Sequence, residues 1–188
     1  MSSPNEIKNG TVINYEGALW VVTRFQRVSP GKGSSFVRTK MKNVQTGKVV
    51  EVSFKSGETV EFADVNYLKM QYLFSDATAH TFMNTQTYEQ VEVPVDNVGE
   101  ASMYLKEGLE TTVVMHAGNP LTIDLPQKVE YTVATAPPAV KGDTASGNVT
   151  KEAVMHNGLK VQVPIFIKVG DRILVNTDTG AYSERVNN

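Results

Sequence analysis

The sequence contains no cysteine, which excludes disulfide bonds and thiolate metal sites and is compatible with a reducing compartment. Long apolar runs are also missing, and the longest of them, such as residues 19–22, are far too short to span a bilayer. Residues 1–6 lack the apolar core of a signal peptide. We therefore expect a soluble, cytoplasmic protein that makes no contact with a membrane.

Patterns typical of catalysis or metal binding are scarce. The only histidines are His80, His116 and His156, and none has a partner at metal-ligand spacing. Residues 31–34 resemble a phosphate-binding loop superficially, but the upstream glycine is missing and strand-like sequence follows where a helix is required. The sequence has no nucleophile elbow and no carboxylate pair suited to acid–base chemistry. We expect no enzymatic activity, no cofactor and no metal.

Acidic residues are absent from residues 17–50, although the chain as a whole has a net charge of −2. The net charge is +3 for residues 1–64, −5 for residues 65–128 and zero for residues 129–188. A locally basic segment on an otherwise neutral or acidic chain predicts that a polyanion is bound at one place. The basic residues of this segment are Arg24, Arg27, Lys32, Arg38, Lys40, Lys42 and Lys48.

Lys32 lies at the centre of a turn, with strand-like sequence on both sides. Its loop consists of Pro30, Gly31, Gly33 and Ser34 around the lysine. Glycine tolerates positive φ and proline fixes the approach, so the sequence predicts a hairpin with one amine at its tip. Local chemistry leaves two interpretations open: an ordinary solvated turn lysine, or a cation that serves a function.

Short segments rich in β-branched and aromatic residues dominate the chain, and turn signals separate them. In residues 36–42 the basic side chains alternate with Val37, Thr39 and Met41, which predicts a ladder of Arg38, Lys40 and Lys42 on one face of a strand. The first part of the chain is therefore expected to form a compact barrel. Its predicted strands are residues 12–15, 19–28, 36–44, 48–54 and 59–62.

The rest of the chain contains a weak internal repeat. Residues 91–94 recur as 161–164, residues 70–74 as 129–133, and residues 108–113 as 170–175. Two copies of a five-stranded oligonucleotide-binding (OB) barrel would produce these similarities. One helix is predicted over residues 98–106, ended by Gly108. We expect three domains, at residues 1–64, 65–127 and 128–188.

Two long motifs resemble the bacterial elongation factor P family. The first is residues 29–40, Ser-Pro-Gly-Lys-Gly-Ser-Ser-Phe-Val-Arg-Thr-Lys, followed by Asn43, Thr46 and Gly47. The second comprises residues 142–145, 157–159, 163–167, 170–173 and 178–182, then Arg185, in the order and spacing of the family. The resemblance covers essentially the whole chain.

The resemblance implies an all-β, L-shaped molecule with an N-terminal SH3-like (KOW-like) barrel and two OB-fold barrels. It implies a monomeric elongation factor that contacts both ribosomal subunits between the peptidyl and exit sites when consecutive prolines stall synthesis. Lys32 matches the tip lysine near the CCA end of peptidyl-tRNA, which a modifying enzyme extends in many members. The candidate phosphate contacts, assigned by charge and position, are Arg24, Arg27, Arg38, Lys40 and Lys42.

The resemblance also assigns residues near the C-terminus. Gly142, Asp143 and Thr144 match a loop that reads the exit-site codon of the mRNA, and Tyr182 and Arg185 match positions near the peptidyl-tRNA. One relative, initiation factor five-A, has a single OB domain, so the second repeat argues against it. A nonspecific single-strand-binding OB protein is the alternative function, and it would need basic grooves with stacked aromatics. The −5 charge of residues 65–128 argues against that alternative.

Overall fold

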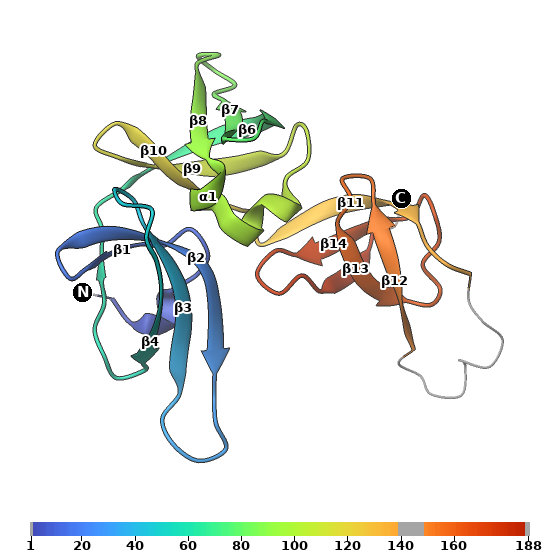
Figure 1. Cartoon of the computed structure of the whole chain (residues 1–188). Helices are drawn as coiled ribbons and strands as arrows, with labels where there is room; N and C mark the ends of the chain where they lie inside the picture. The colour runs from blue at the N-terminus through green and yellow to red at the C-terminus, as the bar shows by residue number, and fades with distance from the viewer. Residues whose placement is uncertain (1, 139–148, 187–188) are drawn as a thin grey trace. The chain divides into compact units, whose positions relative to one another are not determined.

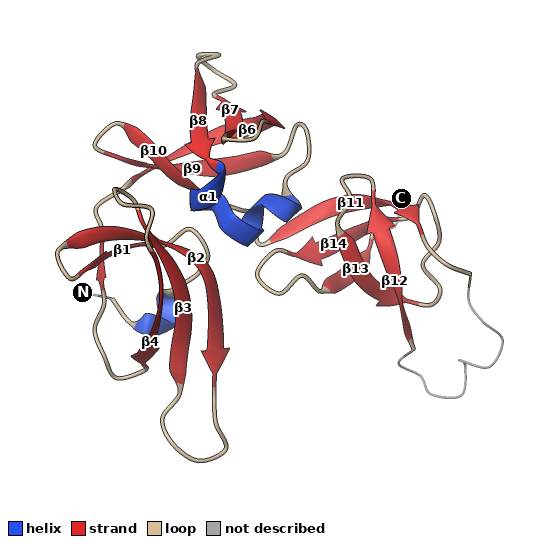
Figure 2. Ribbon diagram, viewed as in Figure 1, coloured by secondary structure: helices blue, strands red, loops and turns tan. Residues whose placement is uncertain are grey.

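The computed structural model describes residues 2–138 and 149–186 and divides the chain into two compact units, residues 1–125 and 126–188. Strands dominate both units (Figure 1), and three five-stranded antiparallel sheets account for them (Figure 2). The first two sheets belong to the first unit and the third sheet to the second unit. The all-β class predicted from the sequence is confirmed.

The first sheet has the strand order β4-β3-β2-β1-β5, and its strands agree closely with the five segments predicted. It is preceded by a 3₁₀ turn, η1 (Pro4–Glu6), which the sequence analysis did not predict and which a capping box of Ser3 and Glu6 begins. The strands are β1 (Val12–Tyr15), β2 (Ala18–Val28), β3 (Phe36–Asn43), β4 (Val49–Lys55) and β5 (Glu61–Phe62).

Strand β3 shows how the first sheet directs one face to its core and the other to solvent. Val37 and Met41 are buried, whereas Arg38 and Lys40, on the opposite face, are exposed. The predicted alternation is therefore confirmed, because a strand directs successive side chains to opposite faces. The buried face joins a core that includes Ile7, Ile13, Trp20, Val22, Phe54 and Val60.

The second sheet has the order β10-β9-β6-β7-β8. Between β8 and β9 lie a single α-helical turn, α1 (Val95–Val98), and a 3₁₀ segment, η2 (Gly99–Tyr104). The helix predicted over residues 98–106 is thus wrong in its bounds and its type. Pro94 begins the helix earlier, and Gly99, with φ of 62°, interrupts the α geometry. The strands are β6 (Asn66–Ser75), β7 (Ala79–Met83), β8 (Gln90–Pro94), β9 (Glu110–His116) and β10 (Asn119–Asp124).

The third sheet repeats the second. Its order, β13-β12-β11-β14-β15, is that of the second sheet when β11 to β15 are matched in turn to β6 to β10. The similar segments 91–94 and 161–164 fall in the matched strands β8 and β13, and 70–74 and 129–133 fall in β6 and β11. The internal repeat is therefore confirmed as a repeated topology. The strands are β11 (Lys128–Thr135), β12 (Thr150–Met155), β13 (Lys160–Pro164), β14 (Arg172–Asn176) and β15 (Tyr182–Arg185).

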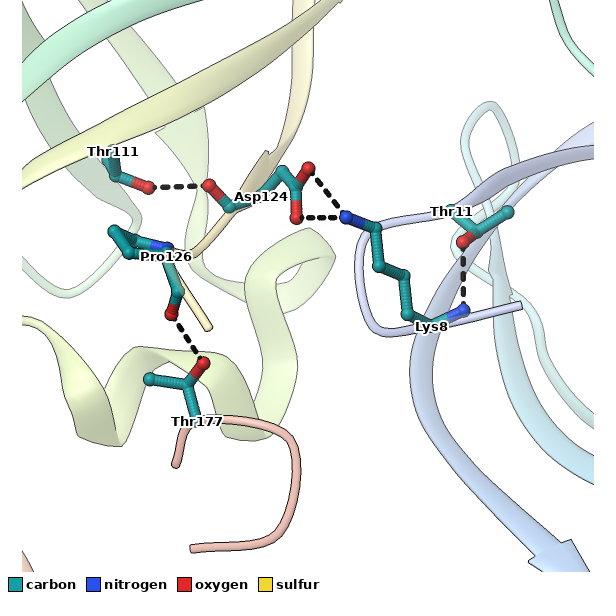
Figure 3. Close-up of polar contacts among 6 residues, drawn as sticks. All are labelled: Lys8, Thr11, Thr111, Asp124, Pro126 and Thr177. Carbon is teal, nitrogen blue, oxygen red and sulfur yellow. Dashed lines mark hydrogen bonds and ion pairs between the residues drawn. The ribbon is translucent and has the colours of Figure 1, made fainter. Parts of the chain in front are cut away.

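Within the first unit the two sheets meet at close backbone contacts and are joined by ion pairs, of which Lys8–Asp124 is one. The Nζ atom of Lys8 lies 2.8 Å from both carboxylate oxygens of Asp124, and the Thr111 hydroxyl donates to the Asp124 carbonyl (Figure 3). Gly10 and Gly99 take positive φ at this contact, and a Cβ on Gly10 would lie 2.2 Å from the Ile123 carbonyl oxygen. The two barrels of this unit are therefore fitted to each other at backbone level.

In the second unit, a buried threonine fixes the start of β11. The Thr177 hydroxyl, just beyond β14, donates to the Pro126 carbonyl at 2.6 Å (Figure 3). Residues 64 and 65 lie between β5 and β6, and residue 127 directly precedes β11. The limits of the three expected domains stay predictions.

Candidate nucleic-acid interface

The loop between β2 and β3 forms a fixed tip. The antiparallel pairing of the two strands ends with Val28 opposite Phe36. The hydroxyls of Ser29 and Ser35 lie 3.2 Å apart across the base of the loop, and the Ser56 hydroxyl donates to the Ser35 carbonyl at 2.8 Å. The ends of the loop are therefore tied to each other and to the neighbouring strand.

The tip itself is open to solvent. Lys32 is exposed, and within residues 2–138 and 149–186 it makes no ion pair or hydrogen bond. The predicted loop residues Pro30, Gly31, Gly33 and Ser34 are exposed as well. Gly33 takes φ of 109°, whereas Gly31, which we also expected to use such freedom, does not take positive φ. The hairpin therefore presents one unpartnered ammonium group.

Arg38 and Lys40 continue the positive charge along β3. Both side chains are exposed, and the Arg38 guanidinium lies 6.0 Å from the Phe36 ring centroid. Lys40 lies opposite Arg24 on one side and Glu51 of β4 on the other. The sequence analysis missed Glu51 because this carboxylate lies just beyond the acid-free segment and reaches the ladder only through strand pairing.

Lys42 and Arg24, two of the five candidate phosphate contacts, are paired with carboxylates of the second barrel. The Lys42 ammonium lies 2.9 Å from Asp96 of α1, and its side chain is only 13% exposed. Arg24 lies 3.5 Å from Glu100 of η2. A cavity of about 320 Å³ lies among these pairs, and Lys40 also lines it. The far end of the ladder is thus occupied by contacts between the two barrels.

Arg27 is engaged within its own barrel. Its guanidinium donates to the carbonyls of Asn5, at 3.0 Å, and Ile7, at 3.3 Å, and lies 4.9 Å from the Phe25 ring centroid. The structure therefore separates the five candidates into two sets. Within the described ranges, Arg38 and Lys40 lack a carboxylate partner, whereas protein groups hold Arg24, Arg27 and Lys42.

The candidate residues near the C-terminus belong to the second unit. Tyr182 begins β15 opposite Val175, and Arg185 ends the strand. The Arg185 guanidinium lies 5.8 Å from the Phe166 ring centroid and 3.9 Å from an Asp171 carboxylate oxygen. Phe166 is therefore a neighbour that sequence reasoning did not single out. The predicted codon loop, Gly142, Asp143 and Thr144, lies outside the described residues.

Two of the three histidines, His80 and His116, bond other groups of the chain. His80 is buried in β7, and its Nδ1 atom bonds the Ser75 hydroxyl, which in turn lies 2.7 Å from the Tyr72 hydroxyl. Burial lowers the pKa of His80, although the charge of Asp76 opposes that shift. His116 bonds the Asp64 carbonyl at 2.8 Å. Among residues 2–138 and 149–186, no three acidic, histidine or cysteine side chains gather as a metal site would require.

Three small antiparallel sheets, the first with a lysine-tipped basic hairpin, define the class of all-β proteins built from KOW-like and OB-type barrels. Family models bear this out domain by domain. The elongation factor P KOW-like domain matches residues 3–60, the elongation factor P OB domain residues 65–123, and the elongation factor P C-terminal domain residues 129–185. The chain belongs to the elongation factor P family, and it is therefore a translation factor.

A full-length relative agrees with the family match. The chain is 44% identical, over 187 residues, to a protein named elongation factor P from Acidothermus cellulolyticus, and the alignment covers 100% of both chains. The resemblance stated from the two sequence motifs is therefore confirmed. No helix in the described ranges is both long enough and apolar enough to cross a lipid bilayer.

Two solved structures resemble part of the chain more distantly. Eukaryotic translation initiation factor 5A from Methanococcus jannaschii aligns with a TM-score of 0.35 and 22% identity, over 66% of this chain and 91% of that one. A translation initiation factor eIF-5A family protein from Naegleria fowleri aligns with a TM-score of 0.33 and 14% identity, over 65% of this chain and 94% of that one. At these scores the structural alignments add no functional argument to the family match.

Proposed function

We propose that the protein binds the ribosome between the peptidyl and exit sites, contacts peptidyl-tRNA, and stimulates peptide bond formation at consecutive prolines. The observation that carries this proposal is the exposed Lys32 ammonium on a hairpin whose base is fixed by hydrogen bonds. A cation of this kind can approach the phosphates at the CCA end of a tRNA without first breaking an internal ion pair.

The mechanism requires no chemistry from the protein itself. The constrained proline ring can hold the end of a nascent chain in a geometry that keeps the ester carbonyl away from the incoming amine. Lys32 steadies the tRNA end and so restores the alignment of the two reactants. Such positioning lowers the activation free energy of a reaction by on the order of several kcal/mol. The ribosome remains the catalyst.

The neighbouring residues support Lys32 in this proposal. Arg38 and Lys40 are the candidate phosphate contacts that form no ion pair with a carboxylate in the part of the chain that the structure describes, so they are the members of the basic ladder that we assign to RNA. We further propose that residues 142–144 read the exit-site codon and that Tyr182 and Arg185 lie near the peptidyl-tRNA. An enzyme that extends the Lys32 side chain would lengthen the reach of the tip. The assay therefore also compares protein with and without such an extension.

The test is reconstituted bacterial translation of a message that encodes three consecutive prolines. We expect the parent protein to raise the yield of full-length product and Lys32→Ala to abolish that gain. Lys48→Ala is the matched control, because Lys48 is an exposed lysine beside another turn of the same barrel. Equal activity of the parent and Lys32→Ala proteins would refute the role of the tip.

The state of Lys32 needs a separate arm. If unmodified recombinant protein is inactive, the same assay is repeated with protein purified from its native host, whose lysine carries any natural extension. Activity only in the native sample would assign the gain to the modification. Inactivity of both samples, while the ribosomes translate a proline-free message normally, would show that the proposed function is wrong.

A further inference from the structure

The first part of strand β6, in the second sheet, has a neighbouring strand on one side only. It pairs with β9 over residues 66–71, whereas its pairing with β7 begins at Gln71, because β7 ends at Met83. Among the strands that the structure describes, no other lies next to β6, and residues 66–69 are all exposed. These residues therefore form an open sheet edge, which we call the free edge of β6.

The backbone groups of this edge are available to a partner. In an antiparallel pair, a residue that bonds the facing strand is followed by one whose N–H and C=O point the other way. Tyr72 bonds the β9 side, since its amide donates to the Leu109 carbonyl and its carbonyl accepts from the Gly108 amide. The pairing with β9 is regular from there on, so the N–H and C=O groups of Tyr67 and Lys69 point away from β9. Within the described ranges, neither residue bonds another backbone group on that side.

Leu68 shows that the core is also left open here. It lies on the same face of β6 as Met70, which is 4% exposed, yet Leu68 itself is 39% exposed. Tyr67, on the opposite face, is 63% exposed. An additional strand beside β6 would cover Leu68 and bond the free backbone groups, which is how an open sheet edge pairs with another chain.

A groove of about 310 Å³ lies at the free edge of β6. One wall is β6 itself, and the other is the loop between β7 and β8, where Asn84, Thr85 and Gln86 line the groove. The Asn84 side-chain oxygen accepts from the Gln86 amide, and the Asn84 amide donates to the Glu89 carbonyl. The loop is thus held by hydrogen bonds of its own, and the space between it and β6 is open to a guest.

The charge of the second barrel indicates which guest would fit. Residues 65–128 have a net charge of −5, Glu110 lines the groove, and Glu89 ends the loop that forms its second wall. Among the lining residues that the structure describes, Lys69 is the one cation. A nucleic-acid strand would meet this negative charge and has no peptide groups to pair with the edge. A basic, extended peptide satisfies both the charge and the backbone groups.

We propose that the free edge of β6 binds an extended basic segment of another protein, which joins the second sheet as a further strand. Main-chain hydrogen bonds to Tyr67 and Lys69 supply affinity, and an apolar guest side chain covers Leu68. On the opposite face, basic guest side chains meet Glu110, which lies opposite Gln71 on the side of the sheet that carries Tyr67. The guest therefore alternates apolar and basic residues. The site uses none of the residues assigned to RNA and extends beyond the proposed function.

The test measures binding of a fluorescein-labelled octapeptide of alternating valine and lysine to the full chain by fluorescence anisotropy. We expect Tyr67→Ala to weaken binding about threefold to fivefold, because the peptide loses an aromatic cross-strand contact. Phe74→Ala is the matched control, since Phe74 is 56% exposed on the same strand but lies where β7 covers the edge. Both side chains are exposed, so both variants should fold, and their thermal unfolding midpoints verify that they do.

Further arms separate strand addition from simple charge attraction. In amide hydrogen exchange followed by NMR, saturating peptide should slow exchange at Tyr67 and Lys69, whose N–H groups would then be bonded. Backbone N-methylation of alternate residues blocks one edge of the peptide, so only one of the two alternately methylated peptides should lose binding. A peptide of the same length that alternates valine and glutamate should bind about tenfold more weakly, because its charge has the sign of the barrel.

Three results would overturn the proposal. If the valine–lysine peptide leaves hydrogen exchange at Tyr67 and Lys69 unchanged, it does not add to this edge. If the valine–glutamate peptide binds as tightly, the charge of the barrel does not select a basic partner. If the parent sediments as a dimer that Tyr67→Ala dissociates, a second copy of this chain occupies the edge instead. None of these results bears on translation at prolines, so the proposed function stands or falls separately.

Discussion

Lys32 and Lys42 belong to the same two-stranded ribbon, yet their surroundings differ. Lys32 is exposed at the tip without a partner in the described ranges, whereas Lys42 is 13% exposed and paired with Asp96. A lysine that is already desolvated and paired gains little from a phosphate, because its first partner must leave. The sequence marks both residues simply as basic. The partner of Lys42 could not be predicted, since Asp96 lies more than fifty residues away in another barrel.

The stability of the protein should depend on pH through His80. Burial lowers the pKa of this histidine, so the folded protein resists protonation, whereas the unfolded chain takes up a proton near the ordinary value of 6.5. Between the pKa of the folded state and that of the unfolded state, the unfolded chain binds more protons than the folded protein does. The free energy of unfolding therefore falls as the pH drops through this range. The stabilising effect of the neutral ring is complete above the unfolded pKa and is lost progressively below it.

This prediction is checked by urea unfolding of the parent and of His80→Gln between pH 8 and pH 5. We expect the parent to lose stability below about pH 6.5 and the variant to lose less over the same range. His156→Gln is the control, because it removes a histidine that is exposed to solvent. Parallel profiles for the parent and His80→Gln would show that another group titrates.

At the scale of elements, strand β3 separates stability from RNA contact by its two faces. Met41 is fully buried in the core of the first barrel, and the adjacent Lys40 is exposed on the opposite face. Met41→Ala should lower the free energy of unfolding by about 2–5 kcal/mol, because it leaves a cavity. Lys40→Ala should change it by less than about 0.5 kcal/mol, as is usual for a surface substitution.

The functional result should be the reverse. Lys40→Ala should lower the yield of full-length product from the three-proline message, while Met41→Ala should act only through the amount of folded protein. Chemical denaturation gives the stabilities, and translation at equal concentrations of folded protein gives the activities. A Lys40→Ala protein with full activity would remove that residue from the proposed RNA contacts.

How well the sequence predicted each element depended on whether the signal was local. The strands of the first barrel follow from alternation and turn residues, so their limits were predicted within a residue or two. The helix over 98–106 was wrong because its limits depend on Pro94 and on Gly99, whose positive φ arises where it packs against Thr23 of the first barrel. The contact of Phe166 with Arg185 was missed because Phe166 lies between β13 and β14, whereas Arg185 lies on β15.

For the whole chain, repetition was the strongest sequence signal. Three short pairs of similar segments predicted two barrels of one kind, and the second and third sheets share one strand order. The sequence did not indicate how closely the first two barrels are fitted to each other. That fit depends on backbone contacts at Gly10 and Gly99, and a glycine in the sequence indicates only that positive φ is permitted.

The fit between the first two barrels can be tested with two glycines of the same backbone conformation. Gly10 has φ of 84° and Gly118 has φ of 81°, so alanine at either position should cost about 1–2 kcal/mol of left-handed strain. Nothing lies within 4 Å of a Cβ on Gly118, whereas a Cβ on Gly10 would lie 2.2 Å from the Ile123 carbonyl oxygen. Backbone cannot move aside as the end of a flexible side chain can.

We therefore expect Gly10→Ala to lower the free energy of unfolding by about 1–3 kcal/mol more than Gly118→Ala, the usual range for overpacking. The displacement should also separate Lys8 from Asp124, because the same segment carries the lysine. Adding Asp124→Asn should consequently destabilise the parent but have little further effect on Gly10→Ala. Equal stabilities of the two alanine variants would mean that the barrels can shift apart at no cost, and that the close contact at Gly10 does not hold them together.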